Sequence, residues 1–325
     1  MRIAVTGSIA TDHLMAFPGK FTEQLVADQL EHVSLSFLVD QLDIRRGGVA
    51  ANIAFGLGSL GISPTLVGAV GADFDDYRSW LQRHGVDTKS VHVSETRHTA
   101  RFLCTTDEAQ NQIASFYAGA MTEARDIELL PVAERLGGLD LVVIAPNDPD
   151  AMVRHTEECR QRGYPFVADP SQQLARMDGA AIRSLVDGAA YLFTNEYETA
   201  LLLQSTGWSH DEVLGRVDTW VMTHGSEGVR IEVKGQDPVQ VSAVPVKAEA
   251  EPTGVGDAFR AGFLWGLNAR LSLERSAQVG CTLATIVLET IGTQEYTLDR
   301  AGFSDRVART YGEVAAAEIE PKLRV

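Results

Sequence analysis

The sequence predicts an α/β protein with a central, mostly parallel sheet, helices on both faces of that sheet, and a smaller β-sheet region. Short apolar runs recur along the chain, and most are followed by a turn and a stretch with helical spacing. Several runs are apolar at every position, as strands buried on both faces of a parallel sheet require. Strands that alternate with helices in this way indicate a doubly wound sheet.

The elements follow one another in a regular order. The runs that predict strands are Ile3 to Thr6, Thr65 to Val70, Leu139 to Ala145, Phe166 to Ala168, Tyr191 to Thr194 and Thr219 to Thr223. The stretches that predict helices are 48 to 60, 73 to 84, 150 to 162, 195 to 205, 257 to 268, 272 to 290 and 302 to 318.

Two stretches, 8–46 and 97–120, break this order. They contain alternating segments without crossover helices: Val33 to Phe37, Arg101 to Thr105 and Ile113 to Tyr117. We expect them to pair into a small sheet, a lid, over the ligand crevice at the carboxyl ends of the main strands. The large domain then comprises residues 1–7, 47–96 and 121–325. The alternative is that both stretches are surface hairpins.

Composition narrows the classes of partner. Twenty-eight Lys+Arg against 44 Asp+Glu give a net charge of −16 over 325 residues, and such a surface repels nucleic acid and anionic membranes. Cys104, Cys159 and Cys281 are odd in number and lack the spacing of a metal site, which favours a reduced compartment. No apolar run approaches membrane-spanning length, and the first residues resemble a strand rather than a signal peptide. We therefore expect a cytoplasmic protein.

One glycine motif is misleading. Gly56-Leu57-Gly58-Ser59-Leu60-Gly61 fits the dinucleotide pattern G-x-G-x-x-G, but that pattern needs a strand before it and a helix after it. Here the preceding residues are helical and a strand follows, so we expect the glycines to end a helix and to allow close packing. The chain also lacks the G-x-x-x-x-G-K-[ST] pattern of a P-loop.

A second glycine-rich turn, Thr253-Gly254-Val255-Gly256-Asp257, leads into an apolar helical stretch. Glycine permits close backbone approach, and the start of a helix presents unpaired N–H groups with a positive dipole end. Such a turn suits a phosphate or a developing anion. Because a carboxylate there would repel a resting anion, we expect Asp257 to take a proton from an attacking hydroxyl. The alternative is that Asp257 caps the helix.

Polar groups suited to a polyol lie near the N-terminus. Gly47-Gly48 forms another turn before a helix, and Asn52 in that helix can donate and accept hydrogen bonds. After the first strand, the segment from Ser8 to Asp12 places a carboxylate where it can accept hydrogen bonds from two vicinal hydroxyls.

Together, the Gly47-Gly48 turn with Asn52 and the turn Gly254-Val255-Gly256-Asp257 resemble the two signatures of the ribokinase-like (PfkB) family of sugar and nucleoside kinases. Further matches lie between them: Asn195-Glu196-Tyr197-Glu198 resembles the family's N-x-x-E, and residues 221–228 resemble its nucleotide-binding strand and turn. The resemblance extends from Ile3 to about Val314. A capping box is the alternative for Asn195 and Glu198.

The resemblance implies a Rossmann-like ribokinase fold with a β-sheet lid, and it implies roles for individual residues. Asp257 is the base that deprotonates a primary hydroxyl, and backbone N–H groups of Gly254, Val255, Gly256 and Asp257 form the anion hole for the γ-phosphoryl group. Mg²⁺ accompanies ATP, with Glu198 acting through water. The residues implied to bind ATP are Asn195, Thr223, Gly225, Ser226 and Gly228.

The chain departs from the family pattern at two places. The second signature usually opens with Asp-Thr, whereas Glu251-Pro252-Thr253 stands here, which bears on the monovalent cation, such as K⁺, that the neighbouring loop helps to bind in relatives. Ala10 stands where ribokinases commonly carry Asn, which weakens an assignment as a ribokinase.

The acceptor is predicted from the lid and from one strand end. Gln172 and Gln173 can offer amide groups to a heterocycle, and Phe102 and Phe116 can sandwich a purine. Ser36 lies on the opposite strand face from its apolar neighbours, and we expect it to point into the site. The alternatives are that the glutamines are surface polar residues and that the two aromatic rings pack within the lid. This combination is more similar to bacterial adenosine and nucleoside kinases than to fructokinases. We therefore expect conversion of adenosine and ATP to AMP and ADP, a purine-salvage reaction. Asp12, Gly48 and Asn52 would hold the ribose, and Ser8 is a further candidate for substrate binding.

Two other functions stay open, namely a ribokinase- or fructokinase-type sugar kinase and a catalytically silent nucleoside-binding regulator. The intact Asp257 turn argues against the regulator. The exposed edges of the lid strands need partners, so we also expect a homodimer that associates through the lids.

Overall fold

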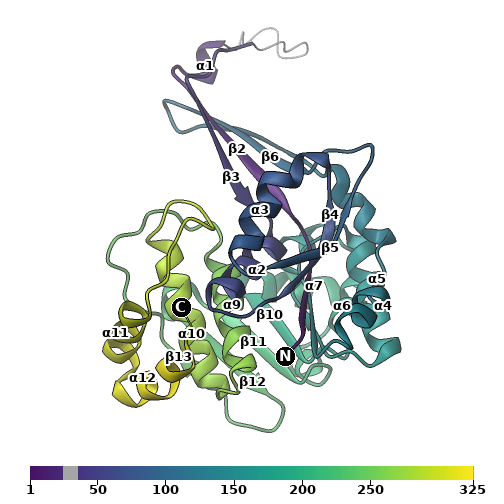
Figure 1. Ribbon diagram of the computed structural model, residues 1–325, viewed down its shortest axis with the longest axis vertical. Coiled ribbons are helices and arrows are strands. Elements are labelled where there is room, and N and C mark those ends of the chain that lie inside the picture. Colours follow the sequence, from purple (N-terminus) through teal and green to yellow (C-terminus); the bar gives the residue numbers. More distant parts are fainter. Residues whose placement is uncertain (25–35, 325) are drawn as a thin grey trace.

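The computed structural model describes residues 1–24 and 36–324 and places their strands in two sheets (Figure 1). The larger sheet has the order β13-β12-β11-β10-β9-β8-β1-β4-β5. Every neighbouring pair from β5 to β11 is parallel, and β12 and β13 extend one edge antiparallel. Its strands are β1 Ile3–Thr6, β4 Thr65–Val70, β5 Asp87–Val93, β8 Leu141–Ile144, β9 Phe166–Ala168, β10 Tyr191–Asn195, β11 Thr219–Thr223, β12 Val229–Val233 and β13 Val239–Val241.

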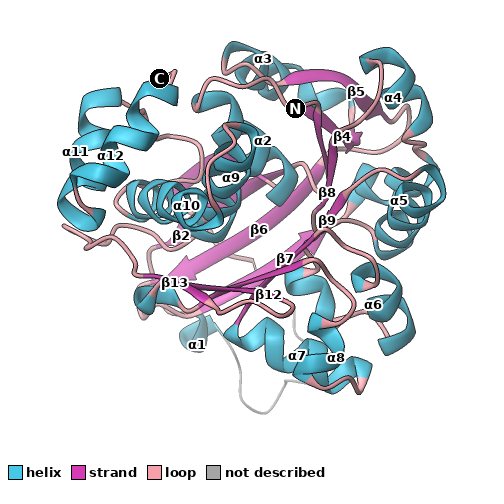
Figure 2. Ribbon diagram, turned by 90° about the horizontal axis from the view of Figure 1, so that it is seen from below, coloured by secondary structure: helices cyan, strands magenta, loops and turns pink. Residues whose placement is uncertain are grey.

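Two hydrophobic cores lie on opposite faces of this sheet. Because successive strand residues point to opposite faces, Ile3 and Val5 of β1 enter one core while Ala4 enters the other. Helices that cover the first face are α2 Val49–Ser59, α3 Asp75–Arg83, α9 Val255–Asn268, α10 Leu273–Leu288, α11 Arg300–Tyr311 and α12 Glu313–Ile319. Helices that cover the second face are α4 Leu130–Leu136, α5 Pro149–Arg162, α6 Gly179–Val186, α7 Glu196–Thr206 and α8 His210–Leu214 (Figure 2).

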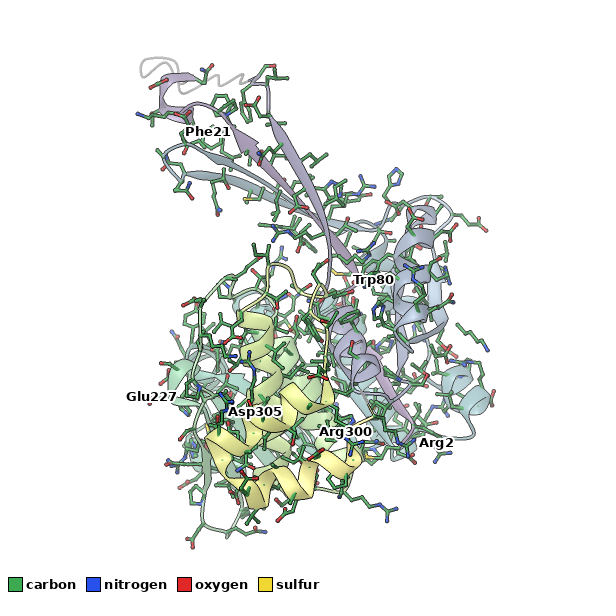
Figure 3. The ribbon with its side chains drawn as sticks, turned by 60° about the vertical axis from the view of Figure 1, so that its left-hand side comes forward. Arg2, Phe21, Trp80, Glu227, Arg300 and Asp305 are labelled. Carbon is green, nitrogen blue, oxygen red and sulfur yellow. The ribbon has the colours of Figure 1, made fainter. Side chains whose placement is uncertain are left out.

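The smaller sheet is the lid, and it projects from the large sheet (Figure 1). Its order is β3-β2-β6-β7, with β2 and β6 parallel and the two outer pairs antiparallel. Its strands are β2 Ala10–Phe17, β3 Gln41–Gly47, β6 Ala100–Asp107 and β7 Gln112–Tyr117. Figure 3 shows Trp80 near the base of the lid and Phe21, in the short helix α1 Phe21–Gln24, at its far end. The predicted fold class with its lid is thus confirmed, while the exact domain boundaries remain a prediction.

Several elements differ from the expectation. The single helix predicted for 302–318 is wrong: α11 ends at Tyr311 and α12 begins at Glu313, because Gly312 has φ 91°. Strands β5, β12 and β13 and helices α4, α6 and α8 were not anticipated. β5 (DTKSVHV) is polar at most positions because it forms the sheet edge, and α8 has only 5 residues, too few to show a helical period.

The segment predicted to form a strand over Val33 to Phe37 lies partly outside the described residues, at 33–35. Its last two residues are not in a strand. The Phe37 ring packs against those of Phe17 and Phe21, with centroids 4.8 and 5.4 Å away. Phe37 therefore belongs to an aromatic cluster at the far end of the lid.

The glycines of 56–61 act as predicted. Helix α2 ends at Ser59, and Gly61 follows with φ 84°. A Cβ on Gly56 would lie 2.6 Å from the Cβ of Ala261 in α9. Absence of that Cβ lets α2 and α9 approach closely, and this contact sets the spacing of the side chains one turn earlier on each helix.

Within the described ranges, no helix is long and apolar enough to cross a membrane. Cys104, Cys159 and Cys281 are all buried and free of disulfide bonds.

Candidate active site

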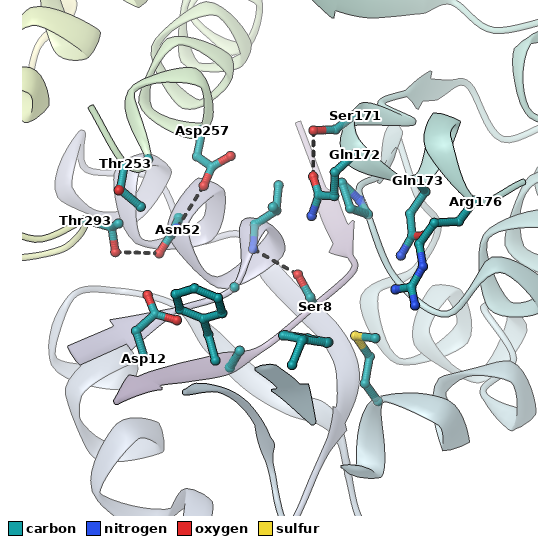
Figure 4. Close-up of a pocket in the computed structure, with 18 residues that line it drawn as sticks. Ser8, Asp12, Asn52, Ser171, Gln172, Gln173, Arg176, Thr253, Asp257 and Thr293 are labelled. Atoms are coloured by element: carbon teal, nitrogen blue, oxygen red, sulfur yellow. Dashed lines mark hydrogen bonds between the residues drawn. The ribbon is translucent and has the colours of Figure 1, made fainter. Parts of the chain in front are cut away.

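One cavity of about 540 Å³ lies between the lid and the carboxyl ends of β1, β8 and β9 (Figure 4). In a doubly wound sheet, this is the position at which strand order reverses and ligands bind. The chain segments that follow β1 and β8 contribute Ser8 and Pro146. The residues predicted from the sequence that line the cavity are Ser8, Asp12, Gly48, Asn52, Phe102, Phe116, Gln172, Gln173, Gly254 and Asp257.

The glycine-rich turn at the start of α9 has backbone geometry that can bind an anion. Gly254 precedes the helix in the left-handed conformation with φ 79°, and α9 begins at Val255. Among the described residues, no acceptor pairs with the N–H groups of Gly254, Gly256 and Asp257. These amides, together with the positive end of a 14-residue helix, can bind a phosphoryl group.

Asp257 is the third residue of α9, so the alternative that it caps the helix is wrong. Its carboxylate lines the cavity and accepts a hydrogen bond from Asn52 Nδ2 at 2.8 Å. Loss of water around the carboxyl raises the pKa of Asp257 to about 7, against the opposing effects of Arg260 and of the Asn52 hydrogen bond. A carboxyl group with a pKa near neutrality is suited to general base catalysis.

Asn52 is held in one orientation by a buried hydrogen-bond network. Thr293 Oγ1 and Gln294 Nε2 both donate to Asn52 Oδ1, at 3.0 and 2.8 Å. Gln294 Nε2 also donates to Tyr77 Oη at 2.6 Å, and that hydroxyl donates to the Gly47 carbonyl at 2.9 Å. The amide oxygen of Asn52 is therefore occupied, and its NH₂ group faces Asp257 with one N–H left for a substrate.

The sequence contained no local sign of this network. Thr293 and Gln294 follow α10 in an irregular loop, more than 240 residues from Asn52. The position of Asn52 in the helix after the Gly47-Gly48 turn, which made it a candidate, does not indicate which of its atoms faces the ligand.

Gly48 brings the start of α2 close to the segment that follows β1. It has φ 93°, and a Cβ there would lie 2.6 Å from the Ser8 carbonyl oxygen. Ser8 Oγ accepts a hydrogen bond from the Val49 amide at 3.0 Å. Ser8 is thus partly committed to fixing this turn, although it also lines the cavity.

Asp12 lies on β2 of the lid rather than at the end of the first strand, with its carboxylate in the cavity. Burial raises the pKa of Asp12 to about 6; the nearby Glu251 adds to this increase, while Arg45 opposes it. Above this pH the carboxylate can accept hydrogen bonds from two hydroxyl groups of a ligand.

Phe102 and Phe116 are cross-strand neighbours on β6 and β7, and both line the cavity. Phe102 is also paired with Asp12 across β2 and β6, so these three side chains share one face of the lid. Phe116 is 47% exposed. Its ring is therefore available to stack on a ligand.

Gln172 and Gln173 lie in the single 3₁₀ turn Ser171–Ala175 after β9. Gln173 is buried and donates from Nε2 to the Asn147 carbonyl at 2.6 Å. Gln172 Oε1 accepts from Ser171 Oγ at 2.8 Å, which leaves its NH₂ group free to donate. Arg176 also lines this end of the cavity and was not predicted (Figure 4).

Ser36 does not line the cavity, which contradicts the expectation that it points into the site. It is exposed and precedes Phe37, whose ring belongs to the aromatic cluster at the far end of the lid. The expected alternation failed at Ser36 because neither Ser36 nor Phe37 is in a strand.

The residues predicted to bind ATP lie at the ends of β10 and β11, outside the large cavity. Asn195 and Glu198 form the capping box of α7, with reciprocal hydrogen bonds of 2.8 Å. Thr223 ends β11, and Gly225 and Ser226 lie exposed in the turn after it. Gly228 has φ 103° and packs against the backbone of β13. A smaller cavity of about 220 Å³ is lined by His224 and Glu227 of this turn.

Mg²⁺ needs few protein ligands when it is bound by nucleotide phosphates, and it usually keeps several water molecules. Glu198 is the residue implied for it. One of its carboxylate oxygens accepts the Asn195 amide, while the other has no partner among the described residues. Glu198 therefore fits a role through water, and the described residues contain no cluster of side chains that would hold a metal ion by themselves.

Glu251 does not fit a monovalent cation. Its Oε2 lies 2.5 Å from Arg45 Nη1 on β3 and accepts the Gly292 amide at 3.0 Å. A guanidinium group already supplies the positive charge at this carboxylate, and Pro252 has no N–H. The departure from the family pattern is thus explained by an ion pair that joins the lid to the loop before the glycine-rich turn of Gly254 to Asp257.

Known proteins that are similar to this chain in sequence or in structure include kinases. Residues 10–300 match the family described as pfkB family carbohydrate kinase, so the chain belongs to that family. The nucleoside kinase of Burkholderia thailandensis in complex with inosine has a TM-score of 0.82, with 33% identity, 95% of this chain covered and 98% of the other. Its complex described as ADP-inosine has a TM-score of 0.80 with 34% identity, covering 95% and 96% of the two chains.

A relative found by sequence similarity is also a nucleoside kinase. The nucleoside kinase of Methanocaldococcus jannaschii is 29% identical over 253 residues, which cover 76% of this chain and 80% of that protein. The predicted family membership is thereby confirmed.

Proposed function

We propose that this protein transfers the γ-phosphoryl group of ATP to the 5′-hydroxyl of a purine nucleoside, adenosine being the acceptor expected from the sequence. The observation that carries the proposal is the position of Asp257, whose carboxylate faces the cavity beside the amides of Gly254 and Gly256, which have no acceptor in the described part of the chain. A base and an anion-binding site side by side are what phosphoryl transfer to a hydroxyl requires.

In the proposed reaction, Asp257 in its carboxylate form accepts the proton of the 5′-hydroxyl while the oxygen attacks the γ-phosphorus. The bond from the γ-phosphorus to the bridging oxygen breaks, and ADP leaves. The Asn52 NH₂ group holds the carboxylate in place through the 2.8 Å hydrogen bond. Amides of the turn stabilise the charge that develops on the phosphoryl oxygens.

The acceptor would lie across the cavity, with ribose at one end and base at the other. Asp12 is placed to accept the two ribose hydroxyls, and Phe102 and Phe116 on the same lid face can stack on the base. Base–aromatic stacking contributes about 1–3 kcal/mol per base. Gln172 NH₂ and Arg176 supply donors at the base end. A relative whose complex contains inosine supports a nucleoside in this position.

The nucleotide would bind along the ends of β10 and β11, near Thr223, Gly225, Ser226 and Gly228. Asn195 and Glu198 lie between this region and the catalytic turn, where Mg²⁺ bound to the phosphates would sit. Mg²⁺ would neutralise charge on the phosphates.

The test is an assay of ADP release with adenosine, inosine, guanosine, ribose and fructose at matched concentrations. We expect the nucleosides to have the higher kcat/KM, with adenosine among them. Faster turnover of ribose or fructose would identify a sugar kinase and refute the nucleoside proposal. Faster turnover of inosine than adenosine would refute only the adenosine preference.

Asp257→Asn separates an enzyme from a silent nucleoside-binding regulator. The variant keeps the shape of the side chain but cannot accept the proton, so kcat should fall by roughly 10²- to 10⁴-fold. Nucleoside affinity, measured by calorimetry, should change little. A variant with near-normal kcat would remove Asp257 from the role of base.

We also propose a homodimer that forms through the lids. Strand pairing puts Leu42, Ile44, Ile113 and Tyr117 on the lid face opposite to Asp12. These four side chains are 44–56% exposed, and an exposed apolar face of this kind is typical of an interface. Analytical ultracentrifugation should give a dimer for the wild type and a monomer for Ile44→Glu. A monomeric wild type would contradict the proposal.

A further inference from the structure

A buried ion pair close to the turn of Gly254 to Asp257 has no role in the reaction proposed above. Arg260, one helical turn after Asp257, contacts Asp169 through two nitrogens, Nε to Oδ2 at 2.6 Å and Nη2 to Oδ1 at 2.6 Å. The Arg260 side chain is 9% exposed and that of Asp169 is fully buried.

Three carboxylates from three elements surround this single guanidinium group. Asp257 lies on α9, Asp169 follows β9, and Glu198 of α7 is 4.0 Å from Arg260 Nη2. The charged groups that act on Asp257 are Arg260, Asp169 and Glu198, with the neutral Asn52 amide on its cavity side. Arg260 is therefore the cation that balances the negative charge of this region.

The guanidinium group also touches the catalytic turn itself. A Cβ on Gly256 would lie 2.9 Å from Arg260 Nη1. Gly256 lies in α9 and is not among the glycines with positive φ, so a side chain at this position would be limited by its contact with Arg260 rather than by backbone strain. The positive charge thus lies next to the turn whose amides would hold the phosphoryl group.

Asp169 links Arg260 to the acceptor side of the cavity. It immediately precedes Pro170 and the 3₁₀ turn that carries Gln172 and Gln173. Since the ion pair joins this segment to α9, movement of the turn relative to Asp257 is restricted.

A purely structural role is a weak explanation for such a pair. Removing two charges from water costs several kcal/mol per ion, and a hydrophobic pair of similar volume is often as stable. The geometry points to Arg260 as a positioning residue for the proposed phosphoryl transfer: it places a buried positive charge one helical turn from Asp257, and its contact with Asp169 fixes the Gln172–Gln173 turn. This inference rests on the proposed role of Asp257 as base.

The two partners of the ion pair give opposite expected effects on Asp257. Arg260→Gln removes the favourable positive charge, so the acidic limb of the kcat/KM–pH profile should move to higher pH by 1 unit or more, on the order of shifts caused by a neighbouring opposite charge. Asp169→Asn removes a neighbouring negative charge and leaves Arg260, so the limb should move to lower pH. Both variants loosen the Gln172–Gln173 turn, so both should raise the acceptor KM.

Arg260→Lys keeps the charge but not the two-nitrogen contact with Asp169. It should restore the position of the acidic limb and leave the acceptor KM raised. Arg306→Gln is the matched control, because Arg306 also pairs with a largely buried carboxylate, Glu289, at 2.5 Å and lies outside the cavity. It should lower thermal stability without moving the profile.

The profiles are measured with whichever acceptor of the panel has the highest kcat/KM, so failure of the nucleoside proposal does not affect this test. Failure of the base role would appear separately, as near-normal turnover of Asp257→Asn. Profiles of Arg260→Gln and Asp169→Asn that coincide with the wild type, or that move in the same direction, would overturn the inference. If Arg260→Gln does not fold, Asp169→Asn and Arg260→Lys decide it.

Discussion

The hydrogen bond from Asn52 to Asp257 predicts a measurable change in the pH dependence of catalysis. In Asn52→Leu, the carboxylate loses the donor that lies 2.8 Å from its Oδ2, so its protonated form becomes more favourable. The variant should fold, because the two donors to Asn52 Oδ1 each keep another acceptor. Gln294 Nε2 still bonds to Tyr77 Oη, and the single hydroxyl proton of Thr293 can be donated to the Arg46 carbonyl, which lies 2.9 Å from Oγ1.

The size of the change can be estimated from the bond. A hydrogen bond to a charged group contributes about 1.5–3 kcal/mol, and one pKa unit corresponds to about 1.4 kcal/mol. Loss of the Asn52 donor should therefore raise the pKa of Asp257 by about 1–2 units from its value of about 7. In the proposed reaction the carboxylate is the active form, so activity should be lost as the pH falls through this pKa. The variant should therefore lose activity at a higher pH than the wild type.

The assay is kcat/KM for the acceptor as a function of pH, since this ratio reports the ionisation of the free enzyme. Ser8→Ala is the control, because Ser8 lines the same cavity but does not contact Asp257. We expect the acidic limb to move upward in Asn52→Leu and to stay in place in Ser8→Ala. An unchanged limb in Asn52→Leu would refute the idea that Asn52 controls the ionisation of Asp257.

Three further predictions concern stability, the turn and the cation. The pKa of Asp257 is raised above its unfolded value, so its ionisation destabilises the fold as the pH rises from that value through about 7. Asp257→Asn should therefore melt at a higher temperature than the wild type in alkaline buffer but not in acidic buffer. An equal increase in melting temperature in both buffers would contradict this. Gly254→Ala forces a side chain into φ 79° and places its Cβ 2.8 Å from Thr293 Cγ2. Thermal melts should show that the free energy of unfolding falls by about 1–2 kcal/mol or more from the left-handed conformation alone, and kcat should fall as well. A variant with unchanged stability and kcat would show that the turn tolerates a Cβ. Replacement of K⁺ by tetramethylammonium should leave turnover unchanged because Arg45 occupies Glu251, whereas a requirement for K⁺ would show that the ion pair opens.

The parts of the site that the sequence made predictable are those built from neighbouring residues. The Gly254 to Asp257 turn was recognisable because glycine conformation and helix-end amides are local properties. Its details were less so: α9 begins at Val255 rather than Asp257, since Gly254 adopts the left-handed conformation and starts the helix two residues earlier.

Contacts between distant residues were not accessible in the same way. Gln294 holds Asn52 across 242 residues of chain, and Arg260 holds Asp169 across 91 residues. Neither pair forms a motif with a recognisable spacing. Asn52 was expected to bind the ribose, and the sequence did not indicate that its NH₂ group would also donate to Asp257. Ser36 was misplaced because an alternating pattern was taken for a strand.

The lid shows the same distinction. Alternation predicted β6 and β7 well because each has one face toward the cavity. It did not predict that β3 would join the catalytic region through Arg45 and Glu251, because two charged residues 206 positions apart carry no pairing signal in the sequence.

The most direct test of the account is the identity of the product formed from ATP and a nucleoside. Incubation of the protein with ATP, Mg²⁺ and adenosine, followed by phosphorus and proton NMR of the product, locates the transferred phosphoryl group. The account predicts a 5′-monophosphate formed in equal amount with ADP, and almost none with Asp257→Asn. Phosphate release without a phosphorylated nucleoside, or equal product from Asp257→Asn, would contradict it.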